Sequence, residues 1–422
     1  MLQVAELPAE QRSRFVPMFI VCALLLIVDG FDAQAIGYVA PLLREQWALS
    51  PDQLGPVFAA GLAGMVVGSL LLSLVADRVG RRPVLIFTAF FCAVVTWATG
   101  HASSVEQLLV IRFVNGIALG GMMPNILALV SDFSPEKRRS QLLMIMACFY
   151  SAGAALGGVL AAWLLPIVGW PAIFHGTAVL AGLIGIAAWR VLPESPHFGR
   201  SALQQQATTT SDDGPQDRGV AALLRKPRTI PTLLLWLMHF MNLAVLYLLS
   251  SWLPLVAKDS GLPLREAVLA GAALQAGSVL GAFGLGALIS RHGFYRVLVP
   301  SYVVGGLAIA TLAFAMQSPA AAVLVAFIAG FCALGGLNGI NALAASSYPS
   351  SLRSTGVGWA LGIGRLGSIL APVLGGTLLA MQWAPRSLLI LAAAPCVILA
   401  LSLLLLSSAT ASGSKQKREV QE

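Results

Sequence analysis

The fifteen residues Gly68–Arg82, GSLLLSLVADRVGRR, join a long apolar run to a short basic segment. A related stretch, GAFGLGALISRHGFY, begins at Gly281, 213 residues further along the chain. A second pair of segments, SDFSPEKRRS and SSYPSSLRST, repeats at nearly the same offset and aligns Pro135 with Pro349. We therefore expect two halves built alike, in parallel repeat, which is an architecture typical of transporters.

The composition of the chain excludes an ordinary soluble protein. Of the 422 residues, 57% are hydrophobic and 10% are charged, whereas about 25% of residues are charged in an average soluble domain. Apolar stretches of about 18 or more residues recur along the whole length, and each can cross a membrane as a helix. The stretches are continuous rather than short and alternating, which excludes a β-barrel. We expect an all-α membrane protein.

The apolar runs predict twelve transmembrane helices in two six-helix halves. They lie near residues 16–40, 55–76, 83–100, 107–131, 140–164, 170–191, 230–256, 266–290, 295–316, 319–345, 354–381 and 386–407. The first span lacks a cleavage site, so it should remain as a helix rather than be removed as a signal peptide. The stretch between spans six and seven contains QQQATTTSDDGPQD, which is too poor in apolar residues to pack. The expected organisation is an N-terminal half (1–191), a cytoplasmic linker (192–229), a C-terminal half (230–407) and a disordered cytoplasmic tail (408–422).

The basic residues are distributed asymmetrically over this topology. With the N- and C-termini cytoplasmic, twenty of the 26 Lys and Arg residues lie on the cytoplasmic side, whereas Arg112 and Arg365 fall inside spans. This distribution follows the positive-inside rule, so the net charge of +8 reflects topology and lipid contact rather than nucleic-acid binding. The five cysteines lie in apolar runs without paired spacing, so we expect neither a disulfide nor a metal site.

Two acidic residues interrupt the first span. Asp29 and Asp32 lie in LLLIVDGFDAQAIGYVAP, residues 24–41, although a charged side chain at the bilayer centre costs roughly 2.5–3.5 kcal/mol. Three residues apart on a helix, they share one face, and Gly30 between them lets another helix or a ligand approach. Intramembrane acids mark ion paths and proton relays, so this pair is predicted to couple transport to protons. The alternative is a structural role, in which they pair with a buried arginine and never titrate.

Several motifs resemble those of one transporter superfamily. The loop between spans two and three has the pattern GxxxxxxxxDRxGRR and is similar to the signature loop of the major facilitator superfamily. The segments DGFDAQAIGYVAP (29–41), GMMPNILALVSDFSP (121–135) and RSTGVGWALGIGRLGSILAPVLGG (353–376) resemble the aromatic acid:proton symporter family within it. The resemblance implies the major facilitator fold, no cofactor, and a multi-pass protein of a bacterial inner membrane.

Arg112 and Arg365 are the candidate ligands for an anion inside the membrane. A guanidinium stays charged and presents a planar fork that matches a carboxylate, so each requires an anion. Arg365 lies mid-span among glycines that leave room, and we expect it to bind the substrate carboxylate. A permanent salt bridge, or pairing between the two halves, is the alternative. Arg112 is expected either to bind substrate or to form an ion pair with the aspartates of span one.

Four further polar side chains inside the spans complete the predicted substrate site. They are His239 and Asn242 in span seven, and Asn338 and Asn341 in span ten. The asparagines are expected either to bond a ring hydroxyl of the substrate or to hold helices together. A lone histidine in a helix is more often a packing residue than a functional one. Transporters built from two halves place such a site between them, near the bilayer midplane.

The basic loop after span two is predicted to act as a conformational latch. Its aspartate can pair with arginines of the loop or with the other half, and such ion pairs break and re-form as the halves rock. The predicted gating residues are Asp77, Arg78, Gly80, Arg81, Arg82, Asp132, Arg139 and Arg353. In the second half Ser290 stands where the first has the aspartate, so no acidic role is expected there. The alternative is a loop that only sets topology.

Together these residues suit a proton-coupled symporter that imports a small aromatic carboxylate, such as 4-hydroxybenzoate, protocatechuate or benzoate, by alternating access. The alternatives are a transporter of another organic anion (muconate, a phenylpropionate or a dicarboxylate), a transporter of a sugar-like solute, and an exporter of hydrophobic compounds. Arg365 argues against a broad-specificity exporter. The sequence contains no nucleophile–base pair or phosphate loop that would indicate an enzyme. We expect a monomer whose partners are the aromatic acid, protons and the lipid bilayer, with no nucleic acid.

Overall fold

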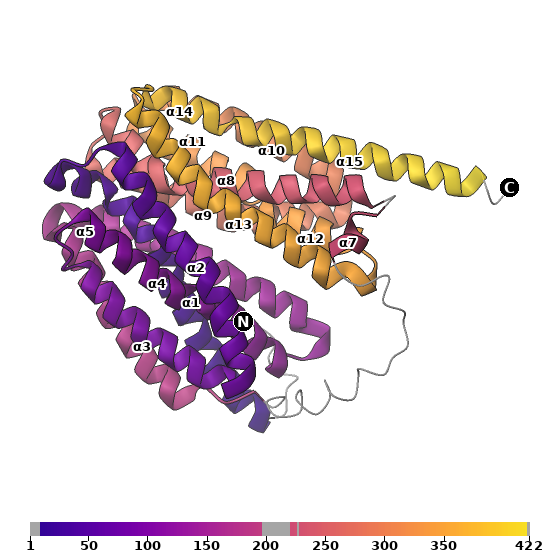
Figure 1. The fold of residues 1–422 in the computed structure, drawn as a ribbon, viewed down its shortest axis with the longest axis horizontal. Coiled ribbons are helices and arrows are strands. Elements are labelled where there is room, and N and C mark those ends of the chain that lie inside the picture. Colours follow the sequence, from indigo (N-terminus) through magenta and orange to yellow (C-terminus); the bar gives the residue numbers. More distant parts are fainter. Residues whose placement is uncertain (1–8, 196–219, 226–227, 420–422) are drawn as a thin grey trace. The chain divides into compact units, whose positions relative to one another are not determined.

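The protein is built from helices (Figure 1), and the computed structural model describes residues 9–195, 220–225 and 228–419. The elements before residue 195 are α1 (Ala9–Trp47), α2 (Pro51–Val79), α3 (Arg81–Thr99), α4 (Val105–Phe133), the 3-10 helix η2 (Glu136–Arg138) and α5 (Arg139–Val191). Those that follow are α7 (Val220–Leu223), α8 (Thr229–Asp259), α9 (Leu264–His292), α10 (Phe294–Ala315), α11 (Pro319–Ala329), the π-helix η5 (Gly330–Leu334), α12 (Leu337–Ser347), α13 (Ser350–Ala380), α14 (Pro385–Ala392) and α15 (Ala394–Glu419).

Eleven helices of the described residues are long and apolar enough to cross a membrane. One of them, α5, has 53 residues and contains a non-helical position at Gly169, where φ is 74° and ψ is 172°. A glycine adopts this conformation at little cost because it has no Cβ. The break divides α5 into two segments that correspond to the fifth and sixth predicted spans. The predicted all-helical membrane fold is thereby confirmed, whereas the orientation of the termini stays a prediction.

The chain divides into two compact units. The first comprises Met1–Gln46 and Ala60–Asp212, and the second comprises Trp47–Ala59 and Asp213–Glu422. Most of the predicted linker, 192–229, lies outside the described residues, although the short helix α7 falls within it. The last helix, α15, continues to Glu419, past residue 408 where the sequence predicts a disordered tail.

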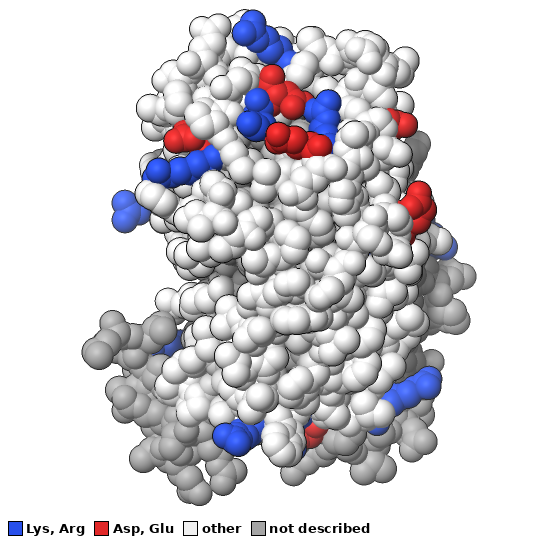
Figure 2. All heavy atoms as spheres, turned by 90° about the vertical axis from the view of Figure 1, so that its left-hand side faces the viewer, with Lys and Arg blue, Asp and Glu red and all other residues white. Residues whose placement is uncertain are grey.

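Large apolar side chains remain exposed along the helices. Leu70, Val94, Ile167, Leu307 and Leu405 are each more than half exposed. Exposed apolar area is unfavourable in water, so lipid is the solvent that these helices require. On the face shown in Figure 2, charged side chains gather in a few places and uncharged residues form most of the surface.

A π-helical turn interrupts the tenth predicted span between α11 and α12. In η5 the backbone hydrogen bonds skip one further residue, which leaves carbonyl groups for other donors. Ser301 Oγ on α10 donates to the Cys332 carbonyl at 2.8 Å, and Asn242 Nδ2 on α8 lies 3.4 Å from the Ala333 carbonyl. Side chains of two neighbouring helices therefore supply hydrogen-bond donors to the carbonyl groups of this turn.

Candidate functional site

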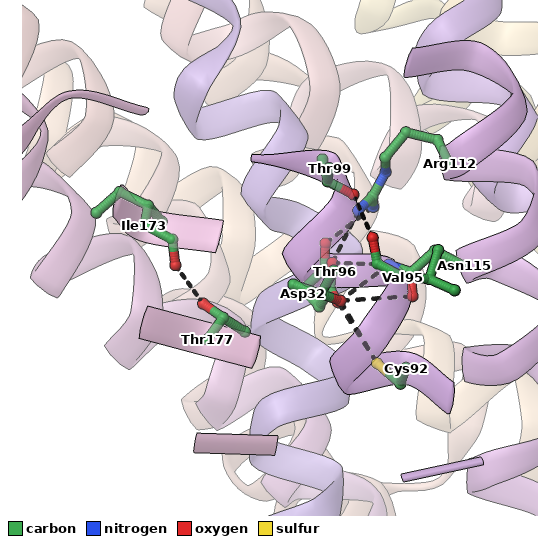
Figure 3. A network of polar contacts seen from close by, with 9 residues as sticks. All are labelled: Asp32, Cys92, Val95, Thr96, Thr99, Arg112, Asn115, Ile173 and Thr177. Carbon is green, nitrogen blue, oxygen red and sulfur yellow. Dashed lines mark hydrogen bonds and ion pairs between the residues drawn. The ribbon is translucent and has the colours of Figure 1, made fainter. Parts of the chain in front are cut away.

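Asp32 is the centre of a buried polar cluster formed by three helices of the first unit, α1, α3 and α4 (Figure 3). Arg112 Nη1 donates to Asp32 Oδ1 at 2.8 Å, and Nη2 donates to the Asp32 backbone carbonyl at 3.0 Å. Asp32 is 0% exposed and Arg112 is 2% exposed. A buried charge of either sign is tolerated when it is paired and hydrogen-bonded, and here each residue supplies the other's partner.

Three uncharged side chains bind the same carboxylate. Asn115 Nδ2 lies 3.1 Å and 3.0 Å from the two oxygens of Asp32, Thr96 Oγ1 donates to Oδ2, and Cys92 Sγ lies 3.6 Å from Oδ2. All three are buried. Cys92 and Thr96 are four residues apart on α3, and Asn115 follows Arg112 by three residues on α4, so each pair shares one helix face. The position of Asp32 is therefore fixed from two helices at once.

Asp29 lies one helical turn before Asp32 on α1 and is 1% exposed. Between them, Gly30 packs directly against the backbone of Tyr150 on α5, where a Cβ would overlap the carbonyl group. The close approach predicted from this glycine is confirmed. Both predicted proton-coupling residues are thus buried.

Arg365 lies in the second unit and in a different environment. It is half-buried near the middle of α13, and it forms no ion pair with any acidic side chain of the described residues. Gly364 and Gly367 flank it and pack against α8, at His239 and Phe240. An arginine in a membrane span requires an anion, and the described part of the chain offers it no carboxylate. The predicted binding of a substrate carboxylate by Arg365 stays a prediction.

The remaining predicted substrate residues of the second unit bond mainly to other helices. His239 Nδ1 lies 2.8 Å from the Leu235 carbonyl, and Nε2 lies 3.1 Å from Asn341 Oδ1. Asn242 Nδ2 donates to Tyr302 Oη at 2.6 Å. The bond to Leu235 lies within α8, whereas the other two join α8 to α12 and α10. Asn338 is exposed on α12. The predicted contact of these side chains with a substrate stays a prediction.

A second polar cluster of the first unit surrounds the start of α3. Arg81 forms an ion pair with Asp132 of α4. The backbone N–H groups of Arg81 and Arg82 point at Glu194 Oε1, at 3.0 Å and 3.4 Å. Ser195 Oγ donates to Asp132 Oδ2 at 2.6 Å. A carboxylate is stabilised at a helix N-terminus because the free N–H groups and the helix dipole favour negative charge there.

The side chains of most other predicted gating residues lie outside this cluster, although Gly80 packs against Glu194. Asp77, which the sequence suggests as the partner of the loop arginines, is exposed and forms no ion pair within the described residues. Arg82 Nη2 donates instead to the Trp189 carbonyl at 2.8 Å. Arg78, Arg139 and Arg353 are exposed. A gating role for these residues stays a prediction.

Comparison with known proteins assigns the family. A family model described as Major Facilitator Superfamily matches residues 22–292 and 235–422. The chain belongs to the Major Facilitator Superfamily. It is a multi-pass membrane transporter rather than an enzyme. The resemblance predicted from the sequence motifs is confirmed.

Two curated relatives in this superfamily have names that state a substrate. The chain is 35% identical over 385 residues to the 4-hydroxybenzoate transporter PcaK of Pseudomonas putida, covering 86% of each chain. It is 35% identical over 407 residues to a gallate transporter of the same species, covering 92% of this chain and 90% of the relative. A solved structure of a bacterial homologue of the human lysosomal transporter Spinster superposes with a TM-score of 0.73 at 19% identity, covering 93% and 96% of the two chains, which supports the fold alone.

The structure identifies site residues that the sequence did not single out. Around Asp32 they are Cys92, Thr96 and Asn115, and at the start of α3 they are Glu194 and Ser195. A signal was present for the first group, because Asn115 shares a helix face with an intramembrane arginine. For the second group the signal was the acidic residue in the short segment PESP that follows α5.

Proposed function

We propose that the protein is a proton-coupled importer of small aromatic carboxylates, such as 4-hydroxybenzoate, protocatechuate or benzoate. The observation that carries the proposal is Arg365, a mid-span guanidinium without an acidic partner among the described residues. A planar guanidinium binds a carboxylate through two parallel hydrogen bonds. The names of the relatives, a 4-hydroxybenzoate transporter and a gallate transporter, favour a benzoate-type anion as its ligand.

Protons are proposed to act at the aspartates of α1. Asp29 and Asp32 are both buried inside an apolar span. An acidic side chain is costly there, so its presence indicates a functional site. Protonation would neutralise the Asp32 carboxylate and so remove the ion pair with Arg112 that joins α1 to α4. This change gives proton binding a mechanical consequence within the first unit. Proton release on the other side of the membrane restores the ion pair.

The cluster at the start of α3 is proposed as a latch of the transport cycle. An ion pair between Arg81 and Asp132, and a hydrogen bond from the Arg81 backbone N–H to Glu194, connect three separate segments of the first unit. Such contacts are accessible to water and exchange partners more readily than the buried pair at Asp32. In the proposed topology this end of α3 faces the cytoplasm of a bacterium, and the protein resides in the inner membrane as a monomer.

The proposal is tested by uptake of radiolabelled 4-hydroxybenzoate into proteoliposomes with an imposed inward proton gradient. We expect uptake above the equilibrium level, collapse of uptake with a protonophore, and competition by protocatechuate and benzoate. Absence of gradient-driven uptake for every acid of the panel would refute the assignment of the substrate class. Retention of full proton-driven uptake in both Asp29→Asn and Asp32→Asn would refute the assignment of the proton site.

A further inference from the structure

Two histidine rings meet at the end of α3 opposite Arg81. His101 follows the last residue of α3 by two positions, and His175 lies on the second segment of α5, beyond the break at Gly169. Nδ1 of His101 lies 3.1 Å from Nε2 of His175, and the ring centroids are 4.6 Å apart. Neither ring belongs to the Asp32 cluster, and the proposed transport mechanism uses neither.

The surroundings hold the two rings in this arrangement. The Trp97 ring contacts both imidazoles, with centroid distances of 4.4 Å to His175 and 5.8 Å to His101. A Cβ at Gly100 would lie 2.5 Å from His175 Nε2, so the absent side chain at this position gives the ring its space. His101 is exposed and His175 is partly exposed, which leaves the pair open to ions from solution.

The separation of the two nitrogens suits a shared metal ion. Zinc binds imidazole nitrogen at about 2.0–2.1 Å in a tetrahedral arrangement, which places two ligating nitrogens about 3.3 Å apart. The observed 3.1 Å is close to that value. The Trp97 carbonyl accepts a hydrogen bond from His101 Nδ1–H at 3.2 Å, so an ion binds at this nitrogen only after that proton has left.

We propose that His101 and His175 form a two-histidine site for a divalent transition-metal ion such as zinc, nickel or copper. Imidazole is a preferred ligand of these ions, and the ion would replace the proton that His101 Nδ1 now donates toward the Trp97 carbonyl and His175 Nε2. The described residues contain no group of three or more His, Cys, Asp or Glu that could hold a metal, so water completes the coordination. The sequence predicts no metal site, because 74 residues separate the two histidines and only the fold brings them together.

The test uses the full chain, purified without a polyhistidine tag, in detergent. Isothermal titration with zinc chloride and thermal unfolding with and without zinc are compared for wild type, His101→Ala and His175→Ala. We expect one zinc ion per chain in wild type and a zinc-dependent rise in melting temperature. Each alanine variant should weaken binding by at least about 10-fold, since even outer-shell changes cost that much. Magnesium, which prefers oxygen ligands, should have no effect.

Two further variants separate metal binding from other effects. His292→Ala removes an exposed histidine of α9 that lies outside the pair and should leave zinc binding unchanged. His175→Gln keeps a side chain that can hydrogen-bond to His101 but supplies a poor metal ligand, so it should unfold like wild type without zinc and lose the response to zinc. The proposal is overturned if wild type shows no zinc binding, or if His292→Ala weakens it as much as the paired variants do.

Discussion

The two intramembrane arginines of this transporter have opposite environments. Arg112 in the first unit is almost completely buried and directs its guanidinium at Asp32. Arg365 in the second unit is only half-buried and forms no ion pair with a described residue. The paired arginine joins helices around a carboxylate of the protein, whereas the other is proposed to bind a carboxylate of the substrate.

Removal of each arginine should separate these two roles. Arg112→Ala leaves the charge of Asp32 buried without its partner, and breaking a buried ion pair costs about 3–5 kcal/mol. Arg365→Ala leaves no acidic side chain of the described residues without its ion-pair partner. We therefore expect the free energy of unfolding of this variant to stay within about 1 kcal/mol of wild type. Thermal unfolding of both purified variants in detergent measures the difference. Equal destabilisation of the two variants would contradict the comparison.

A double variant refines this result. Arg112→Gln combined with Asp32→Asn removes both charges together, and replacing a buried ion pair by neutral groups is often close to neutral in stability. We therefore expect the double variant to be more stable than Arg112→Gln alone. The coupling energy from this double-mutant cycle reports the pair itself. Additive losses would mean that Asp32 and Arg112 do not interact as the structure shows.

The transport assay should rank the arginines for substrate binding. Losing one partner of a desolvated charge pair costs about 2–5 kcal/mol, so Arg365→Ala is expected to lower kcat/KM for 4-hydroxybenzoate by about 30-fold or more. Arg365→Lys keeps the charge but loses the planar fork, and it should fall between wild type and the alanine variant. Proteoliposome uptake at matched protein content gives kcat/KM for both variants.

Arg386 provides the matched control for this series. It is also an arginine of the second unit, but it is exposed at the start of α14. Arg386→Ala should transport like wild type. If Arg365→Ala transported 4-hydroxybenzoate normally, the anion would have to be bound elsewhere and the proposed role of Arg365 would be wrong.

The sequence predicts the residue types of this site more completely than their pairing. An acidic pair in span one and two arginines inside spans are visible from hydropathy alone, because charges are so costly there. Which arginine meets an aspartate depends on how helices pack, and local patterns leave both outcomes open for Arg112. The latch shows the same limit. The motif draws attention to Asp77, yet Arg81 pairs with Asp132, 51 residues away.

Asn115 tests how far the neutral donors stabilise the Asp32 cluster. It lies within hydrogen-bond distance of both carboxylate oxygens, and a hydrogen bond to a charged group contributes about 1.5–3 kcal/mol. We expect Asn115→Ala to lower the free energy of unfolding by about 2 kcal/mol, less than Arg112→Ala. Cys92→Ala, which removes a weak S–H donor, should have the smallest effect of the cluster. Thermal unfolding in detergent establishes the order, and a larger loss for Cys92→Ala would contradict it.

The smallest expected effect compares the same turn in the two repeats. Gly80 before α3 and Gly293 before α10 both have positive φ, 103° and 84°. An alanine in such a conformation costs about 1–2 kcal/mol at either position. At Gly80 the new Cβ would also lie 2.5 Å from Glu194 Oε2, whereas at Gly293 it would meet nothing within 4 Å.

The difference between Gly80→Ala and Gly293→Ala therefore measures the contact of Glu194 with the start of α3. We expect Gly80→Ala to be less stable by a further 0.5–1 kcal/mol, about the contribution of a carboxylate at a helix N-terminus. In a Glu194→Gln background the carboxylate charge is absent, so the two alanine substitutions should differ less. Unfolding temperatures of the four variants suffice. An unchanged difference in that background would assign the extra cost to steric overlap alone, because glutamine occupies nearly the same volume as glutamate.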